Sequence, residues 1–360
     1  QAALICVEGV KAFQKRFAQL AEDMAAACGD ERRKQELLLI AANCRRVPYE
    51  PARTYFEAVQ SFWFVILIDY CGQNGSSISD GRVDQIFRPY FERDLAEGVL
   101  TRDEAQEILE CFWIKHSDVI KAGTYSSVRN NGGFSTANNL VIGGLDENGN
   151  DAVCDFTYLC LDAEENVFNS EPNTSIRLSS KNPDAFINRV LEILVHKEGG
   201  KMPIFNDDQI IPALMRDGLS KKEALDYAIV GCVEPTGYGN TMGSTNAGMF
   251  NLAKCLELAL FDGVCQMSGM QMGPKTGMLT DFTSFEQVKE AFRIQVEYFV
   301  NLMICSLNCT EKLIGDYCPH IFSSLLLDGC TEHGRDCTRG GAKYHHIGTQ
   351  GVGMADVGDC

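Results

Sequence analysis

Apolar side chains recur at helical spacing through much of this 360-residue chain. The spacing predicts helices over residues 7–27, 34–44 and 52–71. The third of these is apolar on almost every side, so we expect it to be buried nearly all round. A polar loop of small residues, 72–82, follows it. A solvated connector is the commoner role of such a loop, although ligand contacts would also suit it.

Three further helices are marked by capping boxes, in which a Ser or Thr precedes a Glu or Gln by three residues. The boxes begin at Thr101, Ser220 and Ser284. Short apolar runs typical of strands lie between the helices, at residues 139–142, 175–178, 202–205 and 228–233. Short strands that alternate with long helices predict an α/β fold with a largely parallel, buried sheet or barrel.

The charge balance narrows the range of partners. The chain has 49 acidic and 32 basic residues, a formal net charge of −17. Such a surface repels phosphate backbones and anionic lipid headgroups, so we expect neither a nucleic acid nor a membrane as a partner. No stretch reaches the roughly 18 consecutive apolar residues that a transmembrane helix needs. We therefore expect a cytoplasmic protein.

The 16 cysteines do not form a recognisable metal or disulfide framework. A chain of this size does not need disulfides, and thiols such as Cys111 and Cys255 lie within apolar helical patterns, so we expect most to be reduced and buried. No pair has C-x-x-C spacing. His345 and His346 are adjacent, and adjacent residues rarely bind one metal. We expect no metal site.

The segment around Cys232 carries the strongest chemical signal. An apolar strand runs into Gly231-Cys232-Val233-Glu234-Pro235 and a Gly-rich loop follows. In an extended backbone residues two apart point to the same side, so the Cys232 thiol and the Glu234 carboxylate can face one cavity. Sulfur can then attack or abstract while the carboxylate moves a proton. On these residues alone, a packing cysteine and a capping glutamate are the commoner case.

The stretch GCVEP, residues 231–235, resembles the thiyl-radical loop of glycyl radical enzymes, in the dehydratase and lyase branch of the pyruvate formate-lyase-like superfamily. Four further stretches resemble the same family, and they lie at residues 40–64, 76–98, 138–152 and 340–359. The resemblance covers essentially the whole chain. It implies a ten-stranded α/β barrel surrounded by helices, incomplete here, with Cys232 on a loop inside it.

The resemblance also implies a reaction. A glycyl radical oxidises Cys232, the resulting thiyl radical removes a hydrogen atom from a substrate carbon, and Glu234 is the general base that deprotonates a substrate hydroxyl. A neighbouring group then leaves, so the implied activity is that of a lyase on a small hydroxylated or carboxylated metabolite. A closed barrel suits this chemistry because it excludes water and oxygen from a carbon radical.

The implied substrate pocket contains Ser76, Ser77, Phe134 and Asn246. Glycerol and propanediol dehydratases have a His-Ser pair where this chain has Ser76-Ser77, and an Asp at the position of Asn246, which puts a diol substrate in doubt. Formate acetyltransferases of the superfamily have two adjacent cysteines, and here Cys232 stands alone, so acyl transfer is disfavoured. The loop around Asn246 also lacks the aromatic residues of choline lyases.

A complete enzyme of this family would be roughly twice as long. We therefore expect residues 1–360 to be a partial barrel domain that lacks the N-terminal part and the C-terminal glycine-radical domain, and to be inactive alone. The resemblance implies no cofactor bound by this chain itself. It implies a radical-generating activase that uses S-adenosylmethionine as a partner, a small-molecule substrate, and anaerobic metabolism, with homodimer assembly left open.

Two other functions remain open at this stage. One is a hydrolase or transferase that uses Cys232 as an ordinary thiolate, which would need a neighbouring base, and no histidine is near it in sequence. The other is a barrel remnant without catalysis, against which the paired Cys232 and Glu234 argue.

Overall fold

The computed structural model describes residues 1–73, 77–120, 122–130, 133, 136–196 and 202–360. Two compact units contain these residues: Gln1–Gly239 with Ile321–Leu326 form the first, and Asn240–His320 with Leu327–Cys360 form the second. Each unit is described by itself.

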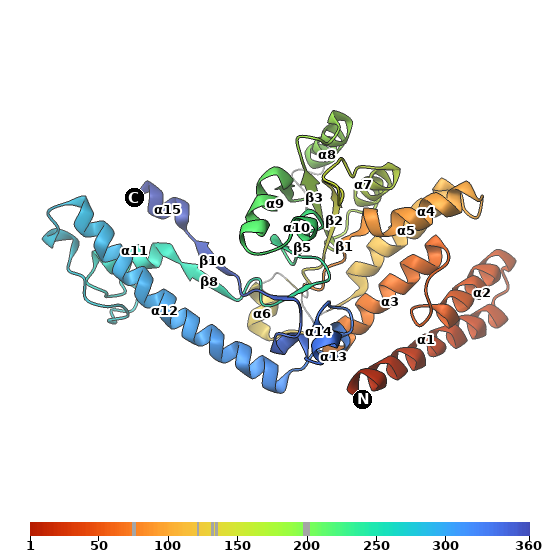
Figure 1. The fold of residues 1–360 in the computed structure, drawn as a ribbon, viewed down its shortest axis with the longest axis horizontal. Helices are drawn as coiled ribbons and strands as arrows, with labels where there is room; N and C mark the ends of the chain where they lie inside the picture. The colour runs from red at the N-terminus through yellow and green to blue at the C-terminus, as the bar shows by residue number, and fades with distance from the viewer. Residues whose placement is uncertain (74–76, 121, 131–132, 134–135, 197–201) are drawn as a thin grey trace. The chain divides into compact units, whose positions relative to one another are not determined.

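The first unit is built on a parallel sheet with the strand order β1-β2-β3-β4. Its strands are β1 (Gly81–Arg82), β2 (Asn139–Gly143), β3 (Asn173–Leu178) and β4 (Ile204–Asn206). Parallel neighbours need long crossover connections, and helices supply them here. Helices α4 and α7 both contact β2, which lies inside the parallel sheet (Figure 1). Every residue of β2 is buried. The predicted α/β class is confirmed.

A cluster of aromatic side chains forms the core beside this sheet. Four of these side chains are almost fully buried: Tyr55, Phe87, Phe112 and Phe156. Their rings meet edge to face in four pairs, Tyr55–Phe87, Tyr55–Phe156, Phe87–Phe112 and Phe87–Phe156, with centroid distances between 5.7 and 6.3 Å. Edge-to-face contact suits the ring quadrupoles and adds to the burial of apolar area.

Several helices of the first unit build this core, and others pack outside it. The helices of the unit have the following bounds. They are α1 (Ala2–Ala27), α2 (Glu31–Arg46), α3 (Tyr55–Gln73), α4 (Val83–Ala96), α5 (Arg102–Asp118), α6 (Tyr125–Asn130), α7 (Asp155–Val167), α8 (Asp184–His196), α9 (Asp207–Arg216), α10 (Lys221–Leu225) and α13 (Ile321–Ser324). No residue between Tyr55 and Tyr70 of α3 is exposed, as its all-round apolar pattern predicts.

The second unit holds two short parallel strand pairs and one long helix. Strand β7 (Thr241–Met242) pairs with β9 (Tyr344–His345), and β8 (Gly248–Asn251) pairs with β10 (Thr349–Val352). The helices are α11 (Leu252–Leu260), α12 (Phe285–Tyr317), α14 (Cys330–His333) and α15 (Met354–Asp359), with short 3₁₀ turns η1 (Leu279–Asp281) and η2 (Cys337–Arg339).

Several sequence expectations need correction. The strand expected over 228–233 ends at Val230, because Gly231 has a positive φ of 62° that turns the chain. The boxes at Thr101 and Ser220 form, but Ser284 makes no capping bond with its side chain. Gln287 instead accepts a 2.7 Å hydrogen bond from the Thr283 backbone N–H.

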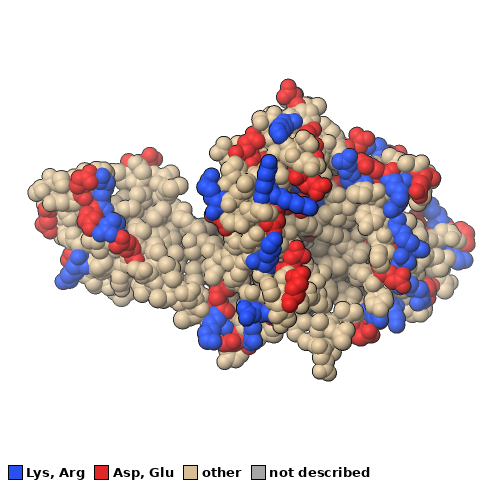
Figure 2. Space-filling view, in the orientation of Figure 1, with Lys and Arg blue, Asp and Glu red and all other residues tan. Residues whose placement is uncertain are grey.

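The strands of the described residues form four separate sheets and do not close into a barrel. The expectation that most cysteines are buried is wrong, because only Cys44, Cys160, Cys255, Cys265, Cys330 and Cys337 are buried. Cys255 is buried. Cys111 is exposed, because the buried side of its helix α5 is formed by other residues, among them Leu109 and Phe112. Acidic and basic side chains are intermixed on the face shown in Figure 2.

Candidate functional site

A β-hairpin presents Cys232. Strand β5 (Ala228–Val230) pairs antiparallel with β6 (Glu234–Thr236), and Val230 lies opposite Glu234 in the register. The residues between them, Gly231-Cys232-Val233, form the turn. The sequence suggested that Cys232 and Glu234 lie on one extended strand, and this prediction is wrong. Cys232 lies on the turn, and Glu234 is the first residue of the returning strand β6.

The Glu234 carboxylate folds back over this turn. Its Oε2 accepts a 2.9 Å hydrogen bond from the Val233 backbone N–H. A Cβ added to Gly231 would lie 3.1 Å from that oxygen and 3.0 Å from the Ser77 hydroxyl oxygen. Ser77 and Glu234 thus both pack against Gly231. The structure brings together three of the predicted site residues, Cys232, Glu234 and Ser77, around this one glycine.

The environment of Cys232 disfavours the thiolate form of its side chain. Partial burial, followed by the Glu234 and Glu171 carboxylates, raises the pKa of the Cys232 thiol above its ordinary value. Negative charges nearby disfavour a thiolate. As a residue, however, Cys232 is exposed in this chain. The expectation that its sulfur lies in an enclosed chamber is therefore not met by the described residues.

A short segment beside the hairpin contacts the turn directly. Ser79 Oγ accepts a 3.1 Å hydrogen bond from the Gly231 N–H and donates to the Ser77 carbonyl oxygen at 3.2 Å. Asn139, the first residue of β2, donates from Nδ2 to the carbonyl oxygens of Gly231 and Cys232, at 3.0 and 3.5 Å. Sequence reasoning did not single out Ser79 or Asn139, although both lie in stretches that resemble the family.

Buried polar groups hold that segment in place. The His116 ring pairs with the Asp80 carboxylate at 2.8 Å, and both side chains are almost fully buried. Burial alone would lower the pKa of His116, but the Asp80 charge and hydrogen bond, with the Phe112 carbonyl, outweigh burial and raise it. Asn138 Nδ2 donates to the Ile78 carbonyl at 2.7 Å. The segment 77–80 is thus fixed at its Asp80 end.

Glu171 connects the neighbouring loop to the same region. Its two carboxylate oxygens accept hydrogen bonds from the backbone N–H groups of Ala137 and Asn138, each at 3.1 Å. It is buried, and its charge contributes to the raised pKa of Cys232. No feature of the sequence identified Glu171, because its link to the site depends on the fold of a segment sixty residues away from the cysteine.

A buried ion pair holds the start of the hairpin. Arg177 of β3 binds both carboxylate oxygens of Asp207 at 2.9 and 2.8 Å, and neither side chain is exposed. Arg177 also donates to the carbonyl oxygens of Tyr227 and Leu225, at 3.0 and 2.9 Å. Tyr227 donates its hydroxyl to Asp207 at 2.7 Å. These bonds fix the residue that precedes β5.

The remaining predicted pocket residues are placed less fully. Ser76 and Phe134 lie outside the described residues. Asn246 is exposed in the turn before β8 and belongs to the second unit.

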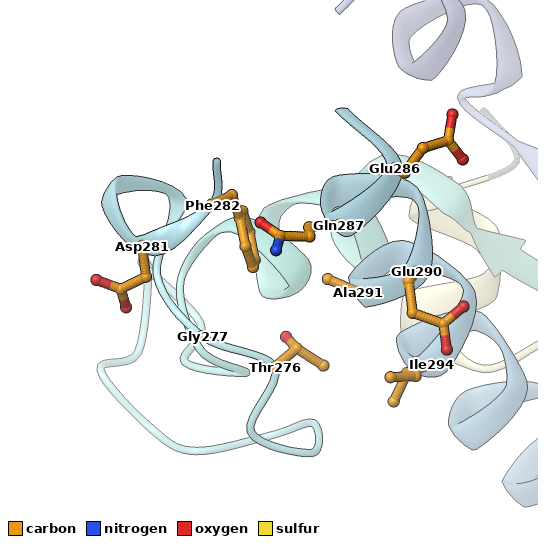
Figure 3. A pocket seen from close by; sticks show the side chains of 9 residues that line it. All are labelled: Thr276, Gly277, Asp281, Phe282, Glu286, Gln287, Glu290, Ala291 and Ile294. Carbon is orange, nitrogen blue, oxygen red and sulfur yellow. The ribbon is translucent and has the colours of Figure 1, made fainter. Parts of the chain in front are cut away.

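The second unit also has an open cavity of about 500 Å³, formed by residues 276–282 and the first turns of α12 (Figure 3). Its acidic lining residues include Asp281, Glu286 and Glu290, and Glu290 already pairs with Arg293. The cavity contains none of the predicted site residues.

Within the described ranges, no three His, Cys, Asp or Glu side chains are grouped in a way that could hold a metal ion. None of the helices described here has the length and apolar character needed to cross a bilayer.

Comparison with known proteins defines the class. The family described as PFL-like, pyruvate formate lyase-like, matches residues 1–360, and the chain belongs to this family. Its homologues are glycyl radical dehydratases and lyases, as the resemblance indicated.

The chain is 33% identical to trans-4-hydroxy-L-proline dehydratase of Clostridioides difficile, over 100% of this chain and 46% of that protein. It is 34% identical to (2S)-3-sulfopropanediol dehydratase of Klebsiella oxytoca, over 99% of this chain and 43% of that protein.

Solved structures agree with this assignment. A structure that describes 1,2-propanediol dehydration in Roseburia inulinivorans matches with a TM-score of 0.94 and 38% identity, over 98% of this chain and 44% of that one. A glycyl radical enzyme from Archaeoglobus fulgidus matches with a TM-score of 0.93 and 35% identity, over 98% and 45% of the two chains. The chain spans less than half the length of the relatives it matches.

Proposed function

We propose that this chain is the thiol and base half of a glycyl radical lyase that acts on a small hydroxyl-bearing metabolite. The observation that carries the proposal is the surroundings of the hairpin turn: the turn presents the Cys232 thiol, and the Glu234 carboxylate and the Ser77 hydroxyl both lie against Gly231. In a member of this family, that combination suits hydrogen-atom transfer at sulfur and proton transfer at a carboxylate.

The proposed reaction starts from a thiyl radical at Cys232, which a glycyl radical stored elsewhere in a longer protein would generate. Cys232 takes a hydrogen atom from the substrate carbon that carries a hydroxyl, so the S–H bond forms as the C–H bond breaks. Glu234 accepts the hydroxyl proton, and the carbon radical becomes a ketyl. The group on the neighbouring carbon then leaves with its electron pair, and Cys232 returns the hydrogen atom to the product radical.

The raised pKa of Cys232 supports this division of labour. A hydrogen-atom carrier must hold its proton at neutral pH, whereas a nucleophilic cysteine needs a depressed pKa. Partial burial first, and then the negative charges of Glu234 and Glu171, raise the pKa of the thiol. The same charges count against the alternative of a thiolate-dependent hydrolase or transferase.

The names of the relatives support the substrate class. Hydroxyproline, sulfopropanediol and isethionate all carry an alcohol hydroxyl group. In isethionate the neighbouring carbon carries the sulfonate that leaves as sulfite, whereas in the two dehydratase substrates a hydroxyl itself leaves as water. We therefore propose only the hydroxyl-bearing class of substrate, with cleavage of a bond from carbon to oxygen, nitrogen, sulfur or carbon. The enclosure that a carbon radical needs would come from the remainder of the longer protein, with activation by a radical-generating activase in an oxygen-free cytoplasm.

The test is a substrate screen with the full-length protein that contains this chain, activated without oxygen. The panel pairs each hydroxylated candidate, a hydroxylated sulfonate, a hydroxylated amino acid and a vicinal diol, with its analogue that lacks the hydroxyl. The proposal predicts that turnover requires both activation and the hydroxyl. Turnover of a hydroxyl-free analogue, or turnover in air without activation, would overturn it.

A further inference from the structure

The tip of the turn, Cys232 and Val233, has little packing of its own. Cys232 and Val233 are both exposed, so apolar burial does not decide where the sulfur points. Hydrogen-atom transfer is sensitive to this direction, because a misplacement of about 1 Å at a reacting group can cost about 100-fold in rate. Something other than the core must therefore fix the turn.

Two side chains bind the backbone at the beginning of the turn. Ser79 Oγ accepts the Gly231 N–H at 3.1 Å, and Asn139 Nδ2 donates to the Gly231 carbonyl oxygen at 3.0 Å. The Gly231 carbonyl belongs to the peptide group that joins Gly231 to Cys232. The Gly231 N–H belongs to the preceding peptide group, so the two bonds fix the peptide groups on both sides of Gly231. Asn139 Nδ2 also lies 3.5 Å from the Cys232 carbonyl oxygen.

Both side chains are anchored to rigid structure. Asn139 is fully buried in β2, where its Cα partner is Asn173 of β3 and its carbonyl oxygen accepts a 2.8 Å hydrogen bond from the Asp80 N–H. Ser79 directly precedes Asp80, which is paired with His116 in the core. A group held by packed elements positions its neighbours more accurately than a group on a free loop.

Asn139 also carries a cost that the fold alone does not require. Its Oδ1 is buried and has no hydrogen-bond partner among the described residues. An unsatisfied buried polar atom costs roughly 1–3 kcal/mol, and an apolar residue at the start of a buried strand would avoid it. Contact with the Gly231 and Cys232 carbonyls is the only use of this side chain in the part of the chain that the structure describes.

We propose that Ser79 and Asn139 are positioning residues that fix the two peptide groups on either side of Gly231 and so aim the Cys232 sulfur at the substrate hydrogen. The inference rests on the proposed function, since it names two further residues of the same site. Neither side chain touches the sulfur, so both act through the backbone of the turn.

The test compares four variants of the full-length, activated enzyme: Ser79→Ala, Ser79→Thr, Asn139→Ala and the control Ser175→Ala. Ser175 is a buried serine of the same sheet whose hydroxyl has no partner among the described residues, so its loss leaves the turn untouched. The readouts are kcat and KM, the glycyl radical content by electron paramagnetic resonance, and the kinetic isotope effect of a deuterated substrate.

Loss of either positioning residue should lower kcat about 10- to 100-fold, because the sulfur is misdirected. KM should stay within twofold, the radical content should be unchanged and the isotope effect should rise. Ser79→Thr, which keeps the hydroxyl, should restore kcat, and Ser175→Ala should behave as the unmodified enzyme. An unchanged kcat in the alanine variants, or a loss that Ser175→Ala reproduces, would overturn the inference.

Hydrogen exchange separates this inference from the proposed function. The Gly231 amide should exchange faster in Ser79→Ala, while the amides of β2 and β3 keep their protection. This readout does not need turnover. If the unmodified enzyme shows no radical-dependent activity but the Gly231 amide responds as described, the proposed function fails and the positioning contact stands. Unchanged exchange at Gly231 would refute the contact itself.

Discussion

Gly231 offers the sharpest test of the local geometry, because its replacement by alanine has two separate destabilising effects, backbone strain and steric crowding. Its φ of 62° lies in the left-handed region, which costs a residue with a Cβ about 1–2 kcal/mol. The new methyl would also lie 3.0 Å from Ser77 Oγ and 3.1 Å from Glu234 Oε2, contacts that oblige these side chains to move.

A matched glycine, Gly98, separates the backbone strain from the crowding. Gly98 has nearly the same φ, 67°, and a Cβ there would meet no atom within 4 Å. Gly98→Ala should therefore show the backbone penalty alone, about 1 kcal/mol after the gain from a stiffer unfolded chain. Gly231→Ala should lose about 1 kcal/mol more, since moving two side chains off their preferred rotamers costs about that much.

The assay is equilibrium unfolding in urea, monitored by tryptophan fluorescence. Both tryptophans of the chain, Trp63 and Trp113, lie in the first unit, so the signal reports the unit that contains the hairpin. The reasoning predicts that Gly231→Ala is clearly less stable than Gly98→Ala. Equal loss in the two variants would show that Ser77 and Glu234 do not crowd Gly231, and the assembled site would then be wrong.

Three other substitutions test the surrounding charges. Glu234→Gln removes one of the charges that, after burial, raise the pKa of Cys232, so this pKa should fall and Cys232 should be alkylated faster at pH 8. Site-resolved mass spectrometry measures the alkylation rate, and an unchanged rate would contradict the prediction. Arg177→Met leaves the Asp207 carboxylate buried without its cation, so the free energy of unfolding should fall by about 3–5 kcal/mol; a fall below about 1 kcal/mol would be the contrary result. His116 has a raised pKa in the fold, so its stabilising charge is fully present below about pH 6.5 and fades as the pH rises through the folded value. The stability advantage over His116→Gln should shrink over that rise, and an advantage that is flat with pH would refute the ion pair.

Local sequence signals predicted the elements of this fold well. Buried strands β2 and β3, the all-round burial of α3 and the capping boxes at Thr101 and Ser220 all follow from patterns within about twenty residues. The box at Ser284 failed because a neighbouring residue competed for the same glutamine, which a three-residue rule does not weigh.

The site was predicted less completely, for a physical reason. The motif identified Cys232 and Glu234, but alternation along a strand misplaced them, since a positive φ at Gly231 converts the strand into a turn. The turn also interacts with three residues from distant segments, Ser79, Asn139 and Glu171. The folded sheet and the loops beside it bring these residues close to the turn. Such contacts between distant segments leave no periodic trace in a sequence.

The most direct test of the central claim is the replacement of Cys232 by serine in the activated full-length protein. A hydroxyl keeps the size and hydrogen bonding of the thiol but does not readily yield a hydrogen atom. The account predicts that Cys232→Ser still accumulates the glycyl radical, seen by electron paramagnetic resonance, yet shows no product and no exchange of deuterium from labelled substrate into solvent. Product formation by Cys232→Ser at a rate near that of the unmodified protein would contradict the account.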